Sequence, residues 1–145
     1  MSRNLETVKN IYAAFGRGAI DVILAALADD VAWEAWADNS AARAGVPWLQ
    51  PRRGKAGAAE FFSLLGSTLV VKEFRVLALM DGGNTIAAEF EIACDIPPTG
   101  GQYRDEEIHL WTFNDAGKVV RLRHYADTAK HIRAAGLRLD DRESS

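Results

Sequence analysis

Two histidines in the second half of the chain, His109 and His124, are the residues best suited to proton chemistry. The unperturbed pKa of histidine, about 6.5, lets its ring give or take a proton near neutral pH. Both histidines lie in alternating segments that flank the turn Asn114–Gly117, and alternation sends every second side chain to the same face of a sheet. We therefore expect an acid/base pair in which one imidazole abstracts a proton and the other polarises a carbonyl group.

The register of that hairpin predicts how close the two rings lie. In a regular hairpin His109 is across from Leu122 and diagonal to His124. Diagonal neighbours are roughly 7–8 Å apart at the backbone, and one water can bridge such a gap. A carboxylate, from Glu107 or Asp127, could hold one ring nitrogen and raise the basicity of the other. A plainer interpretation stays open, with His109 as a hydrogen-bonded core residue and His124 facing solvent.

Three further candidates each allow two interpretations. Tyr12 lies on an apolar helical stripe, so it is either a core aromatic or a hydroxyl donor in a pocket. Asp127 either caps a short helix that begins at Thr128 or places a carboxylate at the pocket mouth. Trp48 lies between two prolines in an aperiodic segment and is a candidate lid residue. The residues expected to line the pocket beside them are Trp33, Ala35, Phe90, Ile92, Glu107, Trp111, Leu122 and Trp48.

The sequence gives little support for a metal or a cofactor. His109, His124 and Glu107 could supply three ligands, but a metal site needs three or four that converge, and strand spacing alone is a weak sign of that. The single cysteine, Cys94, excludes an internal disulfide and a thiolate zinc site. We expect no metal and no cofactor.

Hydrophobic periodicity predicts helices in the first half of the chain and strands in the second. Segregated helices followed by an antiparallel meander indicate an α+β domain. Between the first strand and the third helix, residues 37–54 contain two prolines and no periodicity, which predicts a long loop. The expected helices cover 5–15, 20–27, 55–65 and 128–135, and the expected strands cover 31–35, 68–80, 86–95, 103–113 and 118–126.

The bulk composition excludes several classes of protein. The chain has 145 residues and a net charge of -3 without a basic run, so no electrostatic surface for nucleic acid is expected. It lacks both an apolar stretch long enough to span a membrane and the pattern of a signal peptide, which predicts no membrane contact and a cytoplasmic location. We expect one domain over residues 1–137 and a charged, disordered tail over 138–145.

The order of elements and several motifs resemble the ketosteroid isomerase and SnoaL-like polyketide cyclase group of the NTF2-like superfamily. The resemblance spans roughly residues 5–136. It implies a cone in which N-terminal helices pack on a strongly curved, mostly antiparallel sheet and enclose a pocket. The residues that carry it are Tyr12–Phe15, Gly18, Leu27–Trp33, Gly54–Gly57 with Phe61 and Phe62, and Asn114–Arg123.

The resemblance also implies roles for individual residues. The general-base Asp of the isomerases corresponds to Ala35, which implies that this chain is not a true ketosteroid isomerase. His109 falls at the oxyanion-hole Asp of the isomerases and at a companion His of the cyclases, and Tyr12 falls near the oxyanion-hole Tyr. His124 falls at the acid/base Asp of the cyclases. Histidines thus occupy two acid/base positions.

Three functions remain open from the sequence. The first is a cofactor-free lyase, isomerase or cyclase that moves a proton on a small hydrophobic carbonyl compound. The second is a binding protein that holds an apolar small molecule in the same cone without turnover. The third is a structural or partner-binding domain whose interior is filled by side chains. An epoxide hydrolase ranks below these, because it would need an Asp-Arg-Asp cluster and the arginines here alternate outward.

The outer face of the sheet predicts a partner. Ile108 and Leu110 alternate away from His109 and so lie on that face. Apolar residues on an outer face indicate a covered surface. The resemblance implies a homodimer that packs through this face, and we expect both residues to be buried there.

Overall fold

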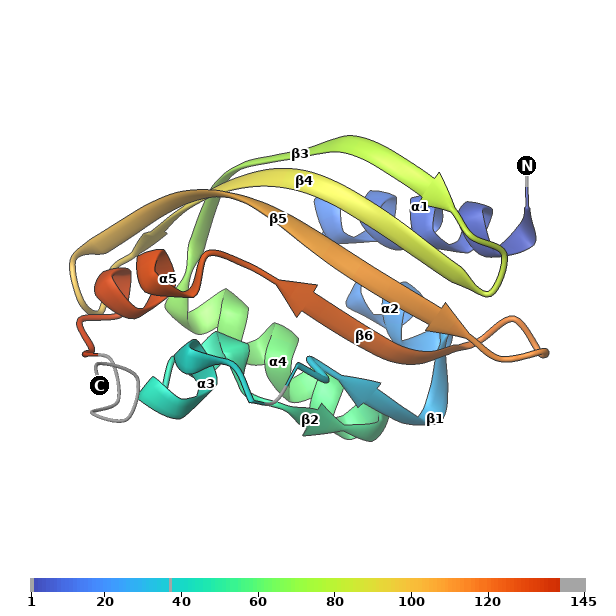
Figure 1. Ribbon diagram of the computed structural model, residues 1–145, viewed down its shortest axis with the longest axis horizontal. Coiled ribbons are helices and arrows are strands. Elements are labelled where there is room, and N and C mark those ends of the chain that lie inside the picture. Colours follow the sequence, from blue (N-terminus) through green and yellow to red (C-terminus); the bar gives the residue numbers. More distant parts are fainter. Residues whose placement is uncertain (1, 37, 139–145) are drawn as a thin grey trace.

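Helices fill most of the first half of the chain and strands fill the second half (Figure 1). The computed structural model describes residues 2–36 and 38–138, so the predicted tail lies outside the described residues beyond residue 138. The helices are α1 (Arg3–Gly16), α2 (Ile20–Ala25), α3 (Ser40–Ala44), α4 (Gly54–Thr68) and α5 (Thr128–Ala134), with a 3-10 helix η1 (Pro47–Leu49). The strands are β1 (Leu27–Trp33), β2 (Arg52–Arg53), β3 (Val70–Asp81), β4 (Thr85–Ile96), β5 (Gly101–Phe113) and β6 (Val119–Tyr125).

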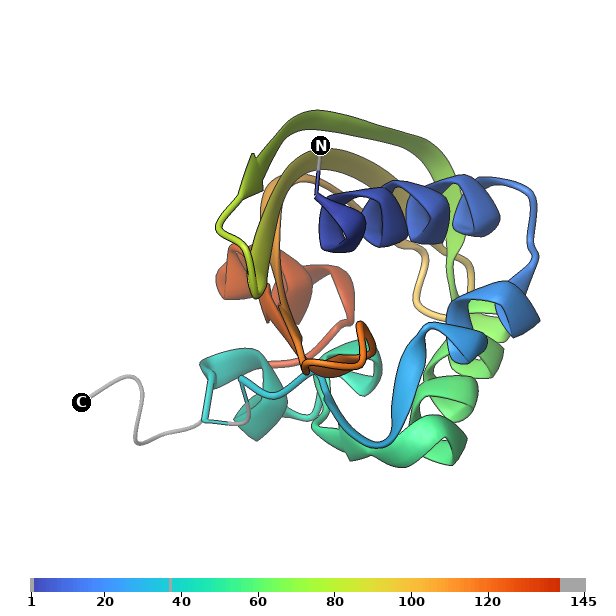
Figure 2. The same cartoon turned by 90° about the vertical axis from the view of Figure 1, so that its right-hand side faces the viewer.

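The six strands form one open sheet in the order β2-β1-β6-β5-β4-β3. Neighbouring strands run antiparallel except β1 and β6, which are parallel. The long strands β3 and β4 bend over α1, so that the sheet curls around the helices (Figure 2). The α+β class and the mostly antiparallel, strongly curved sheet predicted from the sequence are confirmed.

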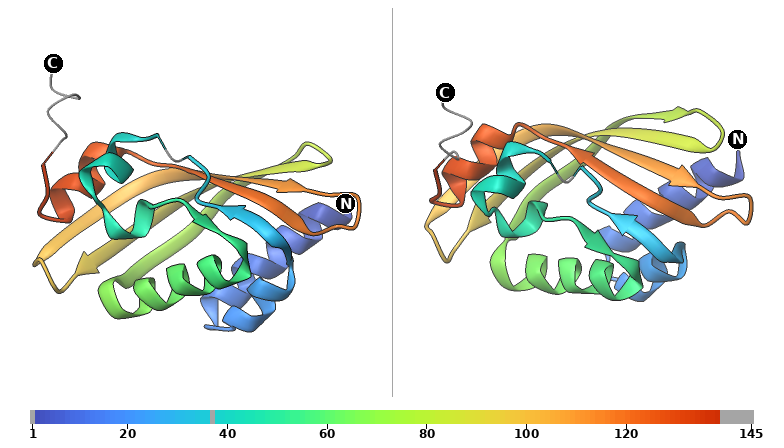
Figure 3. Two further views of the ribbon diagram at one scale, coloured as in Figure 1. Left: turned by 90° about the horizontal axis from the view of Figure 1, so that it is seen from below. Right: turned by 60° about the horizontal axis from the view of Figure 1, so that its bottom comes forward.

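The helices close the concave side of the sheet. Ser2 begins α1 by accepting a hydrogen bond from the Leu5 backbone N–H, and the helix buries Val8, Ile11 and Ala14. Figure 3 shows α4 running across the open side of the sheet. The helices α3 and α5 lie side by side near the start of β5. None of the described helices is long and apolar enough to cross a membrane.

The segment predicted to be a long loop contains ordered helical turns. The side chain of Asn39 accepts a hydrogen bond from the Ala42 backbone N–H and so caps α3, and Gly45 ends that helix with a φ of 91°. Pro47 then begins η1. Trp48 in η1 is only 3% exposed and stacks on Tyr103. Trp48 is therefore a buried wall residue in an ordered segment, and its role as a lid stays a prediction.

The hairpin of β5 and β6 pairs His109 directly with His124, and Trp111 with Leu122. The sequence predicted His109 opposite Leu122, which is wrong by two residues. One of these comes from the turn, which includes Lys118, and the other from a register shift between Thr112 and Phe113. Both shifts together restore the common inward face, so the two histidines are closer than the diagonal arrangement would place them.

The start of β5 is pressed against the end of α5, and this contact sets the position of α5. A Cβ atom at Gly101 would lie 2.0 Å from the backbone oxygen of Ala134. We expect Gly101→Ala to destabilise the fold by more than about 2 kcal/mol, because two backbone segments would have to separate. Gly66→Ala is the control, since nothing lies within 4 Å of its Cβ position. That change should add roughly 0.5–1 kcal/mol of stability. Urea unfolding of both variants measures the difference, and equal midpoints would contradict the proposed backbone contact.

Candidate active site

A cavity of about 70 Å³ lies between the helices and the concave face of the sheet. Most of its wall is aromatic or aliphatic, and two carboxylates and two imidazoles, those of Glu34, Glu107, His109 and His124, also line it. Of the residues that the sequence predicted for this pocket, Ala35 and Asp127 do not line it, whereas the others do. The aromatic lining consists of Tyr12, Phe15, Trp33, Trp48, Phe61, Phe62, Phe74, Phe90, Tyr103 and Trp111.

His124 is held between two buried carboxylates. Its Nδ1 is 3.1 Å from Oε1 of Glu34, and its Nε2 is 2.6 Å from Oε1 of Glu107. A carboxylate only accepts hydrogen bonds, so both ring nitrogens carry a proton and the ring is an imidazolium. Although burial favours the neutral ring, Glu34 and Glu107 raise the pKa of His124 well above its usual value. His124 therefore supplies a fixed positive charge.

Glu34 reaches the cavity because its backbone departs from the strand. Its φ is 56°, and apart from glycines it is the only residue in the described part of the chain with a positive φ. This left-handed conformation turns two successive side chains, Trp33 and Glu34, to the interior, and Glu34 is only 4% exposed. Ala35 then continues the pairing through its backbone N–H, which donates to the Leu122 carbonyl. Regular alternation places Glu34 outside, so sequence reasoning missed it.

His109 has different neighbours from those of His124, and its ring is neutral. Burial and the nearby charge of His124, whose ring centroid is 4.6 Å away, lower the pKa of His109 well below its usual value. Its Nδ1 is 2.7 Å from the hydroxyl of Tyr12, which also accepts a hydrogen bond of 3.0 Å from Nε1 of Trp111. Burial raises the pKa of Tyr12, so its hydroxyl keeps its proton.

These contacts fix the proton on His109. With Trp111 already donating to the hydroxyl oxygen, we assign the Tyr12 proton to the bond with Nδ1 of His109. The neutral ring then carries its own proton on Nε2, an atom without a hydrogen-bond partner among the described residues. The Tyr12–His109 pair therefore offers an N–H donor whose direction is set from behind by a tyrosine and a tryptophan.

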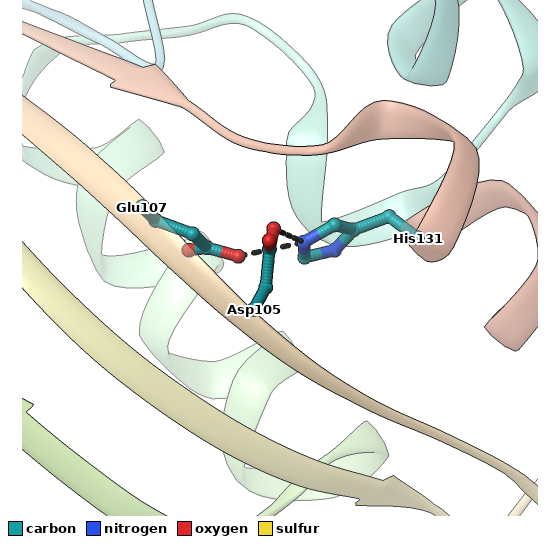
Figure 4. A group of neighbouring side chains, drawn as sticks. All are labelled: Asp105, Glu107 and His131. Carbon is teal, nitrogen blue, oxygen red and sulfur yellow. Dashed lines mark hydrogen bonds and ion pairs between the residues drawn. The ribbon is translucent and has the colours of Figure 1, made fainter.

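Behind the cavity, Glu107 contacts a third histidine. Its Oε2 is 2.7 Å from Nε2 of His131 in α5, and the same nitrogen is 3.3 Å from Asp105 (Figure 4). Trp48 donates a 2.9 Å hydrogen bond to Nδ1 of His131. Sequence reasoning missed His131, although its place beside Ile132 among the buried residues of a short amphipathic helix was a usable signal.

The trio of Asp105, Glu107 and His131 has donor atoms within 4.8 Å of one another, a spacing that a metal ion could use. The tautomer of His131 argues against it. An indole N–H is a donor only, so Nδ1 of His131 must offer its lone pair to Trp48 and the ring proton sits on Nε2. A metal at Nε2 would require an imidazolate or the loss of the Trp48 bond. The donor set fits a hydrogen-bond network, as it does at His124, whose two nitrogens both face carboxylates.

Asp127 takes the structural role that the sequence left open. Its side chain accepts a hydrogen bond from the Lys130 backbone N–H as the N-cap of α5. Its own backbone N–H donates to Asp105 across 2.9 Å. Asp127 thus fixes the start of the helix that carries His131, and the prediction of a catalytic carboxylate at this position does not fit the geometry.

The sequence and the fold identify the family. The sequence profile of the SnoaL-like domain family matches residues 8–122, so the chain belongs to this family. No curated protein matches the sequence at a significant level. An NTF2-like protein of unknown function from Burkholderia pseudomallei is 26% identical with a TM-score of 0.75, and the match covers 93% of this chain and 98% of that one.

Two other solved structures share the fold at lower identity. TerC, co-crystallised with polyporic acid, is 23% identical with a TM-score of 0.70, and the match covers 93% of this chain and 99% of that one. A candidate polyketide cyclase from Pseudomonas putida is 20% identical with a TM-score of 0.70, with 92% and 98% of the two chains covered. The NTF2-like fold that the sequence indicated is thus confirmed.

The charged centre predicts a stability maximum at mildly acid pH. The lowered pKa of Glu107 gives stability that is complete above its unfolded value, about 4.3, and is lost as pH falls towards the folded value. The raised pKa of His124 gives stability that is complete below about 6.5 and is lost as pH rises towards the folded value. Both contributions are therefore complete only between these two pH values.

The substitution Glu107→Gln should lower the free energy of unfolding at pH 5.5 by about 3–5 kcal/mol, since it breaks a buried ion pair. It should also remove most of the loss of stability below pH 4. Glu106→Gln is the matched control, because Glu106 is the exposed neighbour on the same strand. Denaturant unfolding between pH 3 and 9 provides the measurement. An acid limb that persists unchanged in Glu107→Gln would show that other carboxylates cause it.

Proposed function

We propose that this chain is a cofactor-free enzyme that transfers a proton on a small hydrophobic carbonyl compound, in an isomerase, lyase or cyclase type of reaction. The observation that carries the proposal is one aromatic cavity lined by both a carboxylate, Glu34, one oxygen of which has no partner among the described residues, and a neutral donor, His109. Base and donor are separated by the single ring of His124. The class of reaction also agrees with the assignment of the fold neighbour from Pseudomonas putida as a candidate polyketide cyclase.

In the proposed mechanism Glu34 is the base. Its Oε1 is bound to His124, and its Oε2, which has no partner among the described residues, takes a proton from the carbon next to the carbonyl group. The electrons of that C–H bond move to the carbonyl oxygen, where the Nε2–H of His109 donates a hydrogen bond to the developing oxyanion. Glu34 then returns the proton to a second carbon or to a leaving group.

His124 has a supporting role in this mechanism, which differs from the acid/base role expected from the sequence. Its ring has no free lone pair while both carboxylates are bound, so it cannot accept a proton. Its positive charge balances Glu34 and lies beside His109, where negative charge would develop on the substrate. Apolar neighbours such as Phe90 and Leu122 would strengthen this attraction by excluding water.

A second candidate function is small-molecule binding without turnover. The aromatic wall supports it, since aromatic surface binds flat ligands whether or not a reaction follows. TerC, with the same fold, was crystallised with polyporic acid. This alternative requires no proton transfer from a bound ligand, and exchange of the ligand's protons with solvent therefore separates the two functions.

The test uses 2-indanone as a probe with acidic protons next to its carbonyl group. We expect the protein to accelerate exchange of these protons in D₂O, measured by proton NMR, and Glu34→Gln to slow that catalysed exchange by roughly 10²–10⁴-fold. Asp38→Asn is the control, because Asp38 is an exposed acidic residue on the same connection. Binding of 2-indanone, seen as tryptophan quenching, without any exchange would favour the binding function.

We also propose a homodimer that packs through the outer sheet face, with Ile108 and Leu110 at its centre. Ile108 is 37% exposed in the single chain, on the face opposite the cavity. Ion pairs of Arg75 and Arg104 with Glu91 connect β3, β4 and β5 of the same sheet. A polar rim around apolar residues is the usual composition of such an interface.

A cytoplasmic location stays a prediction from the sequence.

Ile108→Lys should convert the proposed dimer into a monomer, because it would bury two unpaired charges close to the two-fold axis. Val22→Lys is the matched control, since Val22 is 40% exposed on α2, away from the sheet. Light scattering after gel filtration gives the mass of each. A monomeric wild-type protein at micromolar concentration would refute the dimer.

A further inference from the structure

We infer that Trp48 and His131 are positioning residues that, together with Glu107, form a hydrogen-bonded arm in the wall of the cavity, and that this arm keeps Glu107 ionised and aimed at His124. We call these three residues the positioning arm. The inference rests on the proposed function only where it concerns catalysis, because the arm would then orient the base Glu34 through His124. The hydrogen bonds that carry it concern the protein alone.

Each hydrogen bond in the arm has one possible direction. The indole of Trp48 donates to Nδ1 of His131, so Nε2 of His131 carries the proton and donates to Oε2 of Glu107. The other oxygen of Glu107 accepts from His124, whose second N–H donates to Glu34. A chain of hydrogen bonds thus runs from Trp48, outside the sheet, through His131, Glu107 and His124 to Oε1 of Glu34. It leaves the other oxygen of Glu34 for the cavity.

The hydrogen bond from His131 helps to stabilise the charged form of Glu107, which burial disfavours. This carboxylate is 2% exposed, and burial by itself would raise its pKa. Its two hydrogen bonds come from His124 and His131, and these two histidines lower the pKa of Glu107 far below its usual value despite burial. If His131 did not donate, one oxygen of Glu107 would be left without a partner in the interior, and a proton would bind there more easily.

Several other groups face the arm. Asp105 accepts a second, longer hydrogen bond from His131, Tyr103 packs its ring 4.2 Å from that of His131, and Cys94 lies beside Tyr103. Lys130 is 3.9 Å from Asp105 at the exposed end of the cluster. Although burial opposes it, the carboxylates of Asp105 and Glu107 raise the pKa of His131. A second ring proton would have to sit on Nδ1, where Trp48 donates, and we therefore assign the neutral ring.

His131 acts through Glu107 because it does not reach the cavity. It is fully buried and absent from the cavity lining, whereas Glu107 belongs to that lining. The arm joins η1, α5 and β5, three segments that are distant in the sequence. Docking of α5 on the sheet is thus coupled to the charge state of a residue in the cavity wall.

The experiment measures the titration of Glu107 in the full chain by carbon-13 NMR of labelled glutamate carboxyl groups. Glu107→Gln identifies the resonance. We expect His131→Leu to raise the pH at which Glu107 binds a proton by at least one unit, a tenfold change in proton affinity, while His131→Gln keeps an N–H donor and stays near the wild type. An unchanged titration in a folded His131→Leu protein, or a Gln variant that behaves as Leu does, would overturn the inference.

A second variant tests the arm if His131→Leu fails to fold. Trp48→Phe keeps an aromatic ring but removes the N–H, so Nδ1 of His131 should bind a proton at higher pH than in the wild type. Nitrogen-15 NMR of the histidine rings reports this, with Trp36→Phe as the matched control on a tryptophan that packs on Tyr125 instead. No shift in Trp48→Phe would overturn the inference. Failure of the 2-indanone exchange would refute the proposed function and leave these NMR results unaffected.

Discussion

The buried imidazolium of His124 is the interaction on which the arrangement of the site depends. An ion pair in the interior is tolerated only when the hydrogen-bonding capacity of its members is met, because desolvation costs several kcal/mol per ion. Here three adjacent strands supply the members: Glu34 comes from the end of β1, His124 from β6 and Glu107 from β5. The curvature of the sheet turns all three side chains to one space. The hydrogen bonds of this charge therefore connect three neighbouring strands on the concave face of the sheet.

The backbone at Glu34 illustrates how the structure stabilises an unfavourable conformation. A residue other than glycine in the left-handed region costs on the order of 1–3 kcal/mol. That conformation is maintained from both sides: Trp33 is packed between Phe61 and Trp111, and the N–H of Ala35 is bonded to Leu122. The side chain of Glu34 is in turn bonded to His124. Strain of this kind clusters at functional sites, and this one presents a carboxylate to the cavity.

The fold and about half of the polar site could be predicted from the sequence. Alternation in the two hairpin strands was enough to place His109, Trp111, Leu122 and His124 on one face, since that pattern survives an even change of register. Alternation failed where the backbone departs from it, at Glu34. It also says nothing about a histidine on a short helix, and the packing of α5 against β5, which brings His131 to Glu107, is a tertiary contact. The helical turns that bury Trp48 were hidden because they are too short to show periodicity.

The two cavity histidines differ in charge, although they are paired across neighbouring strands. The ring of His124 is positively charged and the ring of His109 is neutral. Their partners cause the difference: His124 is bonded to two carboxylates, whereas His109 is bonded to a tyrosine hydroxyl. The charge on the first suppresses protonation of the second, since two imidazolium rings at this distance would repel each other in a medium of low dielectric constant. Two histidines in different charge states can take different parts in a reaction at a single pH. In the proposed mechanism the neutral ring keeps an N–H for an oxyanion, and the charged ring holds the carboxylate that acts as the base.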